Sequence, residues 1–322
     1  MSSAFWIDTL RSIVAASVPL IFAGLGETLT ERAGVVNLSL DGTILLSAMA
    51  GFAAAYLTGS LWPGLLVAMA VGALIAWLVA YASIALRRNQ VAVGFTLTLL
   101  CADLSSFLGR PFSHRPGPSV PHLTLTGLAQ LPVIGPILFD QDPLVYLSYI
   151  LIIGVWLWMA KTQPGLRLRA VGERPESAHA RGIPVHRLRY TYSLIGGALV
   201  GLAGASYSLS VKLGWSHRHT AGIGWIALAI VIFGGWHPLR VAFGAYLFGT
   251  LRSLGGIMQP LYPNVPTQIF QAAPFALMIV ALLAVSGDPA RLELYLPRRL
   301  RPLLGGLLSG TPPAALGRRF DL

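Results

Sequence analysis

Charge is scarce in this chain of 322 residues. Charged side chains make up 11% of it, whereas a typical soluble domain has about 25%. Hydrophobic side chains make up 55%, and the mean hydropathy is +0.68. The composition therefore predicts an all-α, polytopic membrane protein.

Several chemistries have no motif in this sequence. The one cysteine, Cys101, cannot form an internal disulfide. Lys161 and Lys212 are the only lysines and neither follows a glycine, so the chain has no Walker A phosphate loop. No H-E-x-x-H, no cysteine–histidine zinc spacing and no G-x-S-x-G elbow occurs, and His217 and His219 alone are weak support for a metal site. We expect neither an enzyme nor a bound metal or cofactor in this chain.

What is abundant is arginine, which gives a formal net charge of +11. The positive residues lie in loops and in a tail between apolar runs, as in membrane proteins whose cytosolic loops are basic. This pattern favours a membrane-bound chain over a nucleic-acid-binding one, and no nucleic-acid partner is expected.

Apolar runs of about 20 residues are long enough to cross a bilayer. They predict about nine transmembrane helices, with a range of eight to ten, and the short or glycine-interrupted runs predict broken or re-entrant helices. The predicted spans are 11–28, 40–58, 61–86, 91–109, 143–161, 190–211, 221–236, 240–258 and 266–286.

The chain divides into a transmembrane domain, residues 1–287, and a tail, residues 288–322. The tail is basic and rich in proline and glycine, so we expect a cytosolic extension with little fixed structure. The longest stretch without a predicted span, 110–142, is rich in proline. It predicts an external loop with short re-entrant pieces over the outer mouth.

Orientation follows from the basic residues. If the segment 162–189 is cytosolic and nine spans alternate, 17 of the 23 Lys and Arg residues fall on the cytosolic side and 6 on the other. This asymmetry predicts an external N-terminus and a cytosolic C-terminus.

Small residues repeat at one-turn intervals in two spans. Gly197, Gly201 and Ala205 form one stripe, and Ala245, Gly249 and Ser253 form another. Such stripes let two helices approach closely, which predicts helix packing rather than a pore lining.

Polar residues inside membrane spans are costly, so each is a candidate for function. Few of them carry charge, which argues against an ion-coupled secondary transporter and for a path that handles neutral polar solutes by hydrogen bonds. A helix cap beside Arg87 and Arg88 is the alternative role for two of them, Asn89 and Gln90. The candidate path residues are Asn37, Ser39, Asp41, Asn89, Gln90, Asp103 and Gln271.

The stretch "GVVNLSLDG", residues 34–42, separates two apolar runs. Gly34 and Gly42 permit an unwound backbone, and the polar side chains between them offer hydrogen-bond partners. We interpret it as a helix break beside the path. A simple cytosolic turn is the alternative.

A second polar stretch, "GLRLRAVGERPESAHARGIPVHRLRY", spans residues 165–190. Pro175 suits the first turn of a helix, and Gly182 suits its end. They predict a helix of about two turns, within 173–183, that docks a cytosolic partner, with contact to the lipid surface as the alternative. The residues assigned to docking are Gly172, Glu173, Pro175, Ala178, Arg181 and Gly182.

Several segments together resemble one family. "GETLTERAGVVNLSLDG", "RRNQVAVGFTLTLL", "LRAVGERPESAHARGI", "GIGWIALAIVIFGGWHPLRVAFGAYLFG" and "QIFQAAPFALMIVALL" are similar to segments of ABC-transporter permeases of the nucleoside and simple-sugar type. The resemblance covers about residues 12–286. That superfamily also includes branched-chain amino acid permeases, but the E-R-A-G-V-V-N-L pattern is closest to the purine-nucleoside branch.

The resemblance implies a permease subunit of an ATP-driven importer in the bacterial plasma membrane, the shorter of a permease pair. The segment at 173–183 would be the coupling helix. The implied partners are a separate ATPase that uses ATP and Mg, a second homologous permease and an extracellular substrate-binding lipoprotein. Ser39 and Asp41 stand where the family commonly has Gly and Glu, so nucleosides and ribose-like sugars both remain candidates, with branched-chain amino acids as a further alternative.

Overall fold

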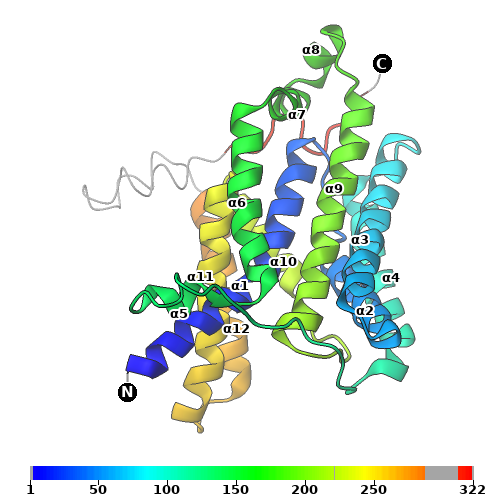
Figure 1. Ribbon diagram of the computed structural model, residues 1–322. Coiled ribbons are helices and arrows are strands. Elements are labelled where there is room, and N and C mark those ends of the chain that lie inside the picture. The colour runs from blue at the N-terminus through cyan, green and yellow to red at the C-terminus, as the bar shows by residue number, and fades with distance from the viewer. Residues whose placement is uncertain (1–2, 221, 287–310, 321–322) are drawn as a thin grey trace.

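The computed structural model describes residues 3–220, 222–286 and 311–320. Its long helices form one bundle, with the helix α8 at one end, called here the α8 end, and the N-terminus at the opposite, N-terminal end (Figure 1). The helices are α1 (Ser3–Arg32), α2 (Leu40–Thr58), α3 (Leu61–Ile84), α4 (Gln90–Leu108), η1 (Arg110–Phe112), α5 (Ile134–Leu138), α6 (Pro143–Lys161), α7 (Gln163–Glu173), α8 (Pro175–Ala180), α9 (Val185–Ser206), the π-helical η2 (Tyr207–Val211), α10 (Ile223–Phe233), α11 (Pro238–Leu261) and α12 (Thr267–Ser286).

A helix overlaps each of the nine predicted spans. In the described part of the chain, seven helices are long and apolar enough to cross a membrane: α1, α2, α3, α4, α6, α9 continued by η2, and α11. The apolar helices at Ile223–Phe233 and Thr267–Val280 are shorter. The all-α, polytopic prediction is therefore confirmed, while the count of nine spans stays a prediction.

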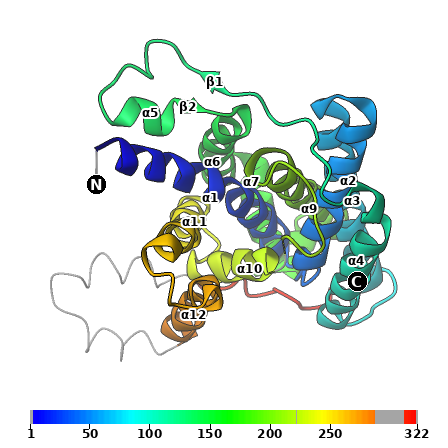
Figure 2. The ribbon, with the colours of Figure 1, turned by 90° about the horizontal axis from the view of Figure 1, so that it is seen from below.

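The centre of the bundle is α1. In its membrane-spanning part 89% of the residues are buried, against 22% in α4 at the periphery. Viewed along the bundle, α1 is surrounded by α6, α9, α10 and α11, and all four helices contact it (Figure 2). Several of its apolar side chains, among them Phe22 and Leu25, have no exposed surface. Because α1 touches most of the other helices, the polar residues on it can act on many elements at once.

Helices α3 and α9 pack along the predicted small-residue stripe. A Cβ atom added to Gly201 would overlap the Ala68 carbonyl oxygen, and one added to Gly72 would overlap the Gly197 carbonyl oxygen. Only hydrogen fits at these places, so the two backbones are in direct contact. The second stripe also allows close packing, here of α11 against α1, because a Cβ on Gly249 would overlap the Ser17 hydroxyl.

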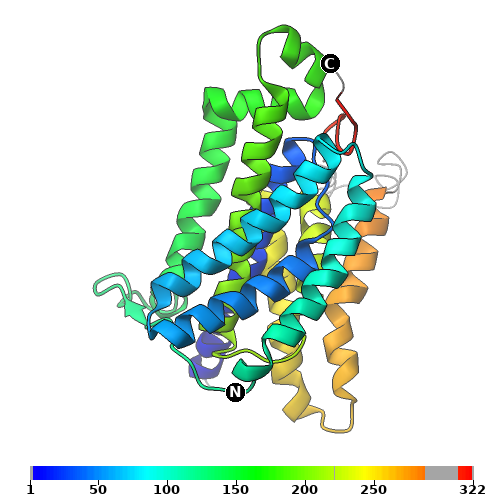
Figure 3. The same ribbon diagram turned by 90° about the vertical axis from the view of Figure 1, so that its right-hand side faces the viewer.

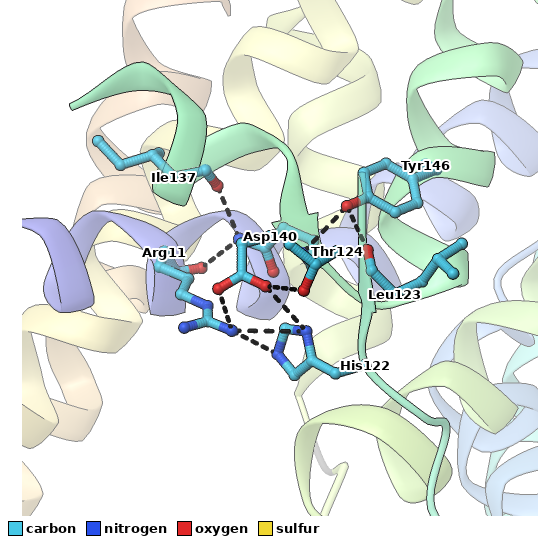
Figure 4. A network of polar contacts seen from close by, with 8 residues as sticks. Arg11, His122, Leu123, Thr124, Ile137, Asp140 and Tyr146 are labelled. Carbon is cyan, nitrogen blue, oxygen red and sulfur yellow. Dashed lines mark hydrogen bonds and ion pairs between the residues drawn. The ribbon is translucent and has the colours of Figure 1, made fainter. Parts of the chain in front are cut away.

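The predicted loop 110–142 crosses the N-terminal end of the bundle (Figures 1 and 2). It contains η1, α5 and a two-stranded antiparallel sheet, β1 (Leu123–Thr124) and β2 (Asp140–Gln141). Figure 4 shows how its ends are joined to α1: Asp140 forms an ion pair with Arg11 at 3.0 Å and accepts a hydrogen bond from Thr124 at 2.7 Å. Gln141 donates to the carbonyl oxygens of Arg11 and Ile137. These contacts fix the loop across the end of the bundle.

The tail differs from expectation where the structure describes it. Residues 311–320, expected to have little fixed structure, pack against the α8 end of the bundle, and Ala315 and Phe320 are 4% and 7% exposed (Figure 3). That expectation is therefore wrong for these ten residues, because buried apolar side chains and backbone hydrogen bonds hold them. Residues 287–310, most of the predicted tail, lie outside the described residues.

We expect the substitution Gly72→Leu to force α3 and α9 apart, because the new side chain would overlap the backbone of α9. Overpacking of this kind costs about 3 kcal/mol. The measurement is the melting temperature of the purified chain in detergent. Gly154→Leu is the control: Gly154 lies on the exposed face of α6, where an added Cβ would have no atom within 4 Å. Equal melting temperatures for the two variants would contradict close contact of α3 and α9.

Candidate functional site

Residues 33–39 connect α1 to α2 and are called here the break segment. It accepts and donates hydrogen bonds along α4: the amide of Val36 donates to Gln90 Oε1 at 2.7 Å, and the hydroxyl of Thr98 donates to the Leu38 carbonyl at 2.7 Å. Gln90 and Thr98 are eight residues apart on α4, a rise of about 12 Å. The break segment therefore runs alongside α4 before α2 begins, and five of its seven residues are buried, as expected for a helix break that enters the bundle.

Side chains of the break segment satisfy its own backbone. Asn37 Oδ1 accepts hydrogen bonds from the amide and the hydroxyl of Ser39, at 3.1 and 2.5 Å. The Ser39 hydroxyl is also 3.1 Å from that of Thr43. Asn37 and Ser39 are both buried. Non-helical backbone at membrane depth needs such internal partners, because no lipid atom can supply them.

Asp41 joins two helices that begin inside the bundle. It is the second residue of α2, and its Oδ1 accepts hydrogen bonds from the amides of Gly222 and Gly224 at 2.8 and 3.0 Å. These amides belong to the first turn of α10, whose N-terminus carries a partial positive charge. A Cβ on Gly224 would overlap the Asp41 amide nitrogen, so the two chain segments touch. With 11 residues, α10 is about 16 Å long, and the turn that follows it contacts the end of α1 through Trp236 and Glu31.

Two buried glutamates on α1 hold this region together. Glu27 Oε1 accepts a hydrogen bond from the Asn37 amide at 3.2 Å, and Glu31 accepts one from the indole N–H of Trp236. Glu27 has no exposed surface and Glu31 is 4% exposed. They connect α1 to the break segment and to the turn between α10 and α11. Both glutamates belong to the "GETLTER" stretch, but no pattern in the sequence indicates that their partners are Asn37 and Trp236.

Next to them, Arg32 links the break region to α7. Its guanidinium donates to the carbonyl oxygen of Trp236 at 3.2 Å and lies 3.6 Å from a carboxylate oxygen of Glu173. Gly172 packs on the same residue, since a Cβ there would overlap the Arg32 carbonyl oxygen. The end of α1 is therefore in direct contact with the end of α7.

The segment assigned to docking forms two short helices at the α8 end, between α6 and α9 (Figure 1). As the sequence predicted, Pro175 lies in the first turn of α8 and Gly182 follows its end in a left-handed conformation, with φ of +77°. Pro175 and Ala178 are buried, whereas Arg181 is exposed. The helix is six residues long, somewhat shorter than predicted, and it is preceded by a separate helix, α7, that the sequence did not distinguish from it.

The remaining candidate path residues are spread more widely. Asn89 is exposed and caps α4 by accepting a hydrogen bond from the Ala92 amide, which is the alternative role considered for it. Asp103 lies toward the other end of α4, where its 80% exposed side chain is 3.9 Å from Arg218. Gln271 belongs to α12, but its side chain lies outside the described part of the structure. The structure thus brings Asn37, Ser39, Asp41 and Gln90 together and leaves Asn89 and Asp103 apart from them.

A cavity of about 880 Å³ lies toward the N-terminal end, between η2, the following loop, α11 and α12. We call it the vestibule. No carboxylate lines it within the described part of the chain. Its lining includes four cationic side chains and four aromatic ones: Arg115, Lys212, Arg218, Arg252, Tyr207, Trp215, Phe270 and Phe275.

Arg252 is a vestibule cation that the sequence places inside a predicted span, 240–258. It donates a hydrogen bond to the Tyr207 hydroxyl at 2.6 Å and lies 5.1 Å from the centre of that ring. His219 is close to the same ring, at 5.3 Å, and burial lowers its pKa to about 4, so its imidazole is neutral at physiological pH. An arginine in an apolar span was the signal that could have revealed this site.

Known proteins provide an independent comparison. The chain matches the family described as "Branched-chain amino acid transport system / permease component" over residues 9–282. It is 38% identical over 271 residues to a Haloferax volcanii protein provisionally named a glucose ABC transporter permease, with 82% of each chain covered.

It is also similar to two bacterial proteins. The guanosine ABC transporter permease protein NupQ of Bacillus subtilis is 33% identical, covering 87% of this chain and 94% of its own. The nucleoside ABC transporter permease protein NupC of Lactococcus lactis is 34% identical, covering 86% and 92%. No solved structure matches the chain. Since the family match spans most of the sequence, this chain belongs to the permease family of branched-chain amino acid and related ABC transport systems.

Proposed function

We propose that this chain is the membrane-spanning permease subunit of an ATP-driven importer that moves a small polar solute inward by alternating access. The observation that carries the proposal is the contact between α7 and the end of α1, through Gly172, Glu173 and Arg32. It gives an element outside the apolar bundle a direct mechanical link to the helix break inside it. A motor that moves α7 and α8 would therefore move the break segment.

The proposed partners are those that the family resemblance implies. A separate ATPase grips α8, a second homologous permease completes the path, and an external lipoprotein delivers the solute to the vestibule. The α8 end is then cytosolic and the N-terminal end external, in a bacterial plasma membrane. The opposite placement of α8 and the N-terminus supports this orientation (Figure 1).

The first candidate for the solute is a nucleoside, and the second is a simple sugar. Two of the three relatives above are named for guanosine or nucleosides, and one for glucose. The vestibule supports a ring-bearing solute, because aromatic side chains stack on planar bases and arginine donates to carbonyl oxygens and ring nitrogens. A branched-chain amino acid also carries an ammonium group, for which the described lining offers no carboxylate.

Within the path, the break segment and the start of α10 provide the movable parts. Half-length helices that begin inside a membrane protein let backbone amides and carbonyls face a cavity. The buried set Asn37, Ser39, Asp41 and Gln90 holds these ends in the present state. Opening toward one side would exchange some of these internal hydrogen bonds for bonds to the solute, and ATP supplies the difference in free energy between the two states.

Residue 37 should become accessible during turnover. In a Cys101→Ser background, we expect the single cysteine of Asn37→Cys to react with a hydrophilic maleimide about tenfold faster while the assembled transporter hydrolyses ATP, because turnover populates states in which the break segment is open. Solute should slow the reaction. Arg88→Cys is the control: Arg88 is exposed, so its label should react equally in every state. Labelling of residue 37 that ignores both ATP and solute would contradict a path at the break.

Loss of the Arg32 link should separate ATP hydrolysis from transport. Arg32→Met removes the charge-assisted hydrogen bond to the Trp236 carbonyl, worth about 2 kcal/mol, and the ion pair with Glu173. We expect solute uptake into proteoliposomes to fall about tenfold while ATP hydrolysis by the complex continues. Arg88→Met, an exposed residue at the same end of the bundle, should leave both rates unchanged. An Arg32→Met complex with normal uptake per ATP would overturn the proposed route of coupling.

A further inference from the structure

The C-terminal segment 311–320 lies beside α8 and the break segment (Figure 3). We call it the C-terminal clasp. Its backbone bonds to both of the elements that the proposed mechanism must connect: the Ala315 amide donates to the Gly172 carbonyl at 2.8 Å, and the Gly317 amide donates to the Gly34 carbonyl at 3.1 Å. The clasp thus bridges the end of α7 and the first residues after α1.

Two further polar contacts hold the clasp. The Ala314 amide donates to a carboxylate oxygen of Glu173 at 3.2 Å. Arg189, which is buried in α9, donates from Nη1 to the Arg318 carbonyl at 3.1 Å. A buried guanidinium is costly without acceptors, so this carbonyl stabilises Arg189 as well as the clasp.

The fit of the clasp depends on a left-handed glycine. Gly34 has φ of +88°, and a Cβ there would lie 3.0 Å from Arg189 Nη2 and 3.2 Å from the Ala315 carbonyl oxygen. A larger residue would push the clasp away from the break segment. The glycine therefore serves the approach of the C-terminus and not only the end of α1.

The last described residue of the clasp anchors α8. The Phe320 ring lies 5.7 Å from the ring of His179 and 5.3 Å from that of His186, and it packs in a small apolar cluster with Val171, Ala178 and Val185. A helix as short as α8 has little stability of its own. Phe320 supplies it with an apolar surface to pack against, so the clasp helps to set where α8 stands.

The clasp also adds charge to the exposed surface around α8. Arg318 and Arg319 are exposed, as are Arg174, Arg181 and Arg187 on and beside α8. Glu176 is exposed too, and the half-exposed Glu173 is paired with Arg32. The α8 end therefore presents a surface with more positive than negative side chains, to which the clasp contributes two arginines.

We propose that the C-terminal clasp and α8 together form one docking surface for the ATPase, with the clasp holding α8 in place and its two arginines binding acidic side chains of that partner. This inference rests on the proposed function, since it assumes that α8 is the coupling helix. The inference extends the proposed function by assigning the clasp, residues 311–320, to the interface with the ATPase. Because the two arginines would bind acidic side chains of the ATPase, docking should weaken as salt screens these charges.

The test measures how much ATPase the solubilised permease complex retains, at low and at raised salt. Reversing both charges, Arg318→Glu with Arg319→Glu, should weaken ATPase binding about tenfold and reduce its salt dependence, because exposed side chains are changed and the fold is kept. Phe320→Ala should also weaken binding by freeing α8, whereas Phe320→Leu, which keeps an apolar anchor, should restore most of it. Arg110→Glu, an exposed charge reversal in η1 at the N-terminal end of the bundle, is the matched control and should have no effect.

The outcomes separate the inference from the proposed function. If the double charge reversal and Phe320→Ala retain as much ATPase as the unaltered chain, the clasp is no part of the interface, although α8 can still be. If the charge reversal weakens binding to vesicles containing anionic lipid but leaves ATPase retention unchanged, the arginines contact the membrane surface and the inference is overturned. If the unaltered chain binds no ATPase, the proposed function itself fails.

Discussion

The fold depends on one constraint: the backbone between α1 and α2 leaves the helical hydrogen-bond pattern inside a bundle where lipid offers no replacement. Every partner must therefore come from the protein. Glu27 supplies one for Asn37, Gln90 supplies one for Val36, and Thr98 supplies one for Leu38. These donors and acceptors sit on α1 and α4, so the break can exist only while the two helices hold their places on either side of it.

Close packing by small residues is what keeps the helices there. The contact of α3 with α9 has no room for a side chain at Gly72 or Gly201, and α9 in turn touches α1 at Gly26 and Gly196. When helix backbones are in direct contact, the helices either keep their register or separate. A bundle packed in this way therefore has few stable conformations between its two end states. That property suits the alternation between two states that we propose for this chain.

Much of this architecture was predictable from the sequence. Apolar runs of this length form helices in a membrane, so the sequence predicted the positions of the long helices. The stripe at Gly197 and Gly201 indicated a site of close helix packing, which is the contact of α9 with α3. The helix at Pro175 followed from local rules for helix starts and ends. What sequence alone could not reveal were contacts between distant segments: Asp41 with Gly222, Glu31 with Trp236, and Phe320 with α8. None of these pairs shares a spacing that periodicity could detect, and the vestibule is formed by such distant segments as well.

The pairing of Asp41 with α10 has an electrical consequence. A helix that starts within the bilayer places about half a positive charge there, which would attract chloride and other small anions. The Asp41 carboxylate occupies that position, and its negative charge outweighs the partial positive charge of the helix end. In the transport path proposed above, the start of α10 is therefore closed to small anions for as long as Asp41 keeps this contact.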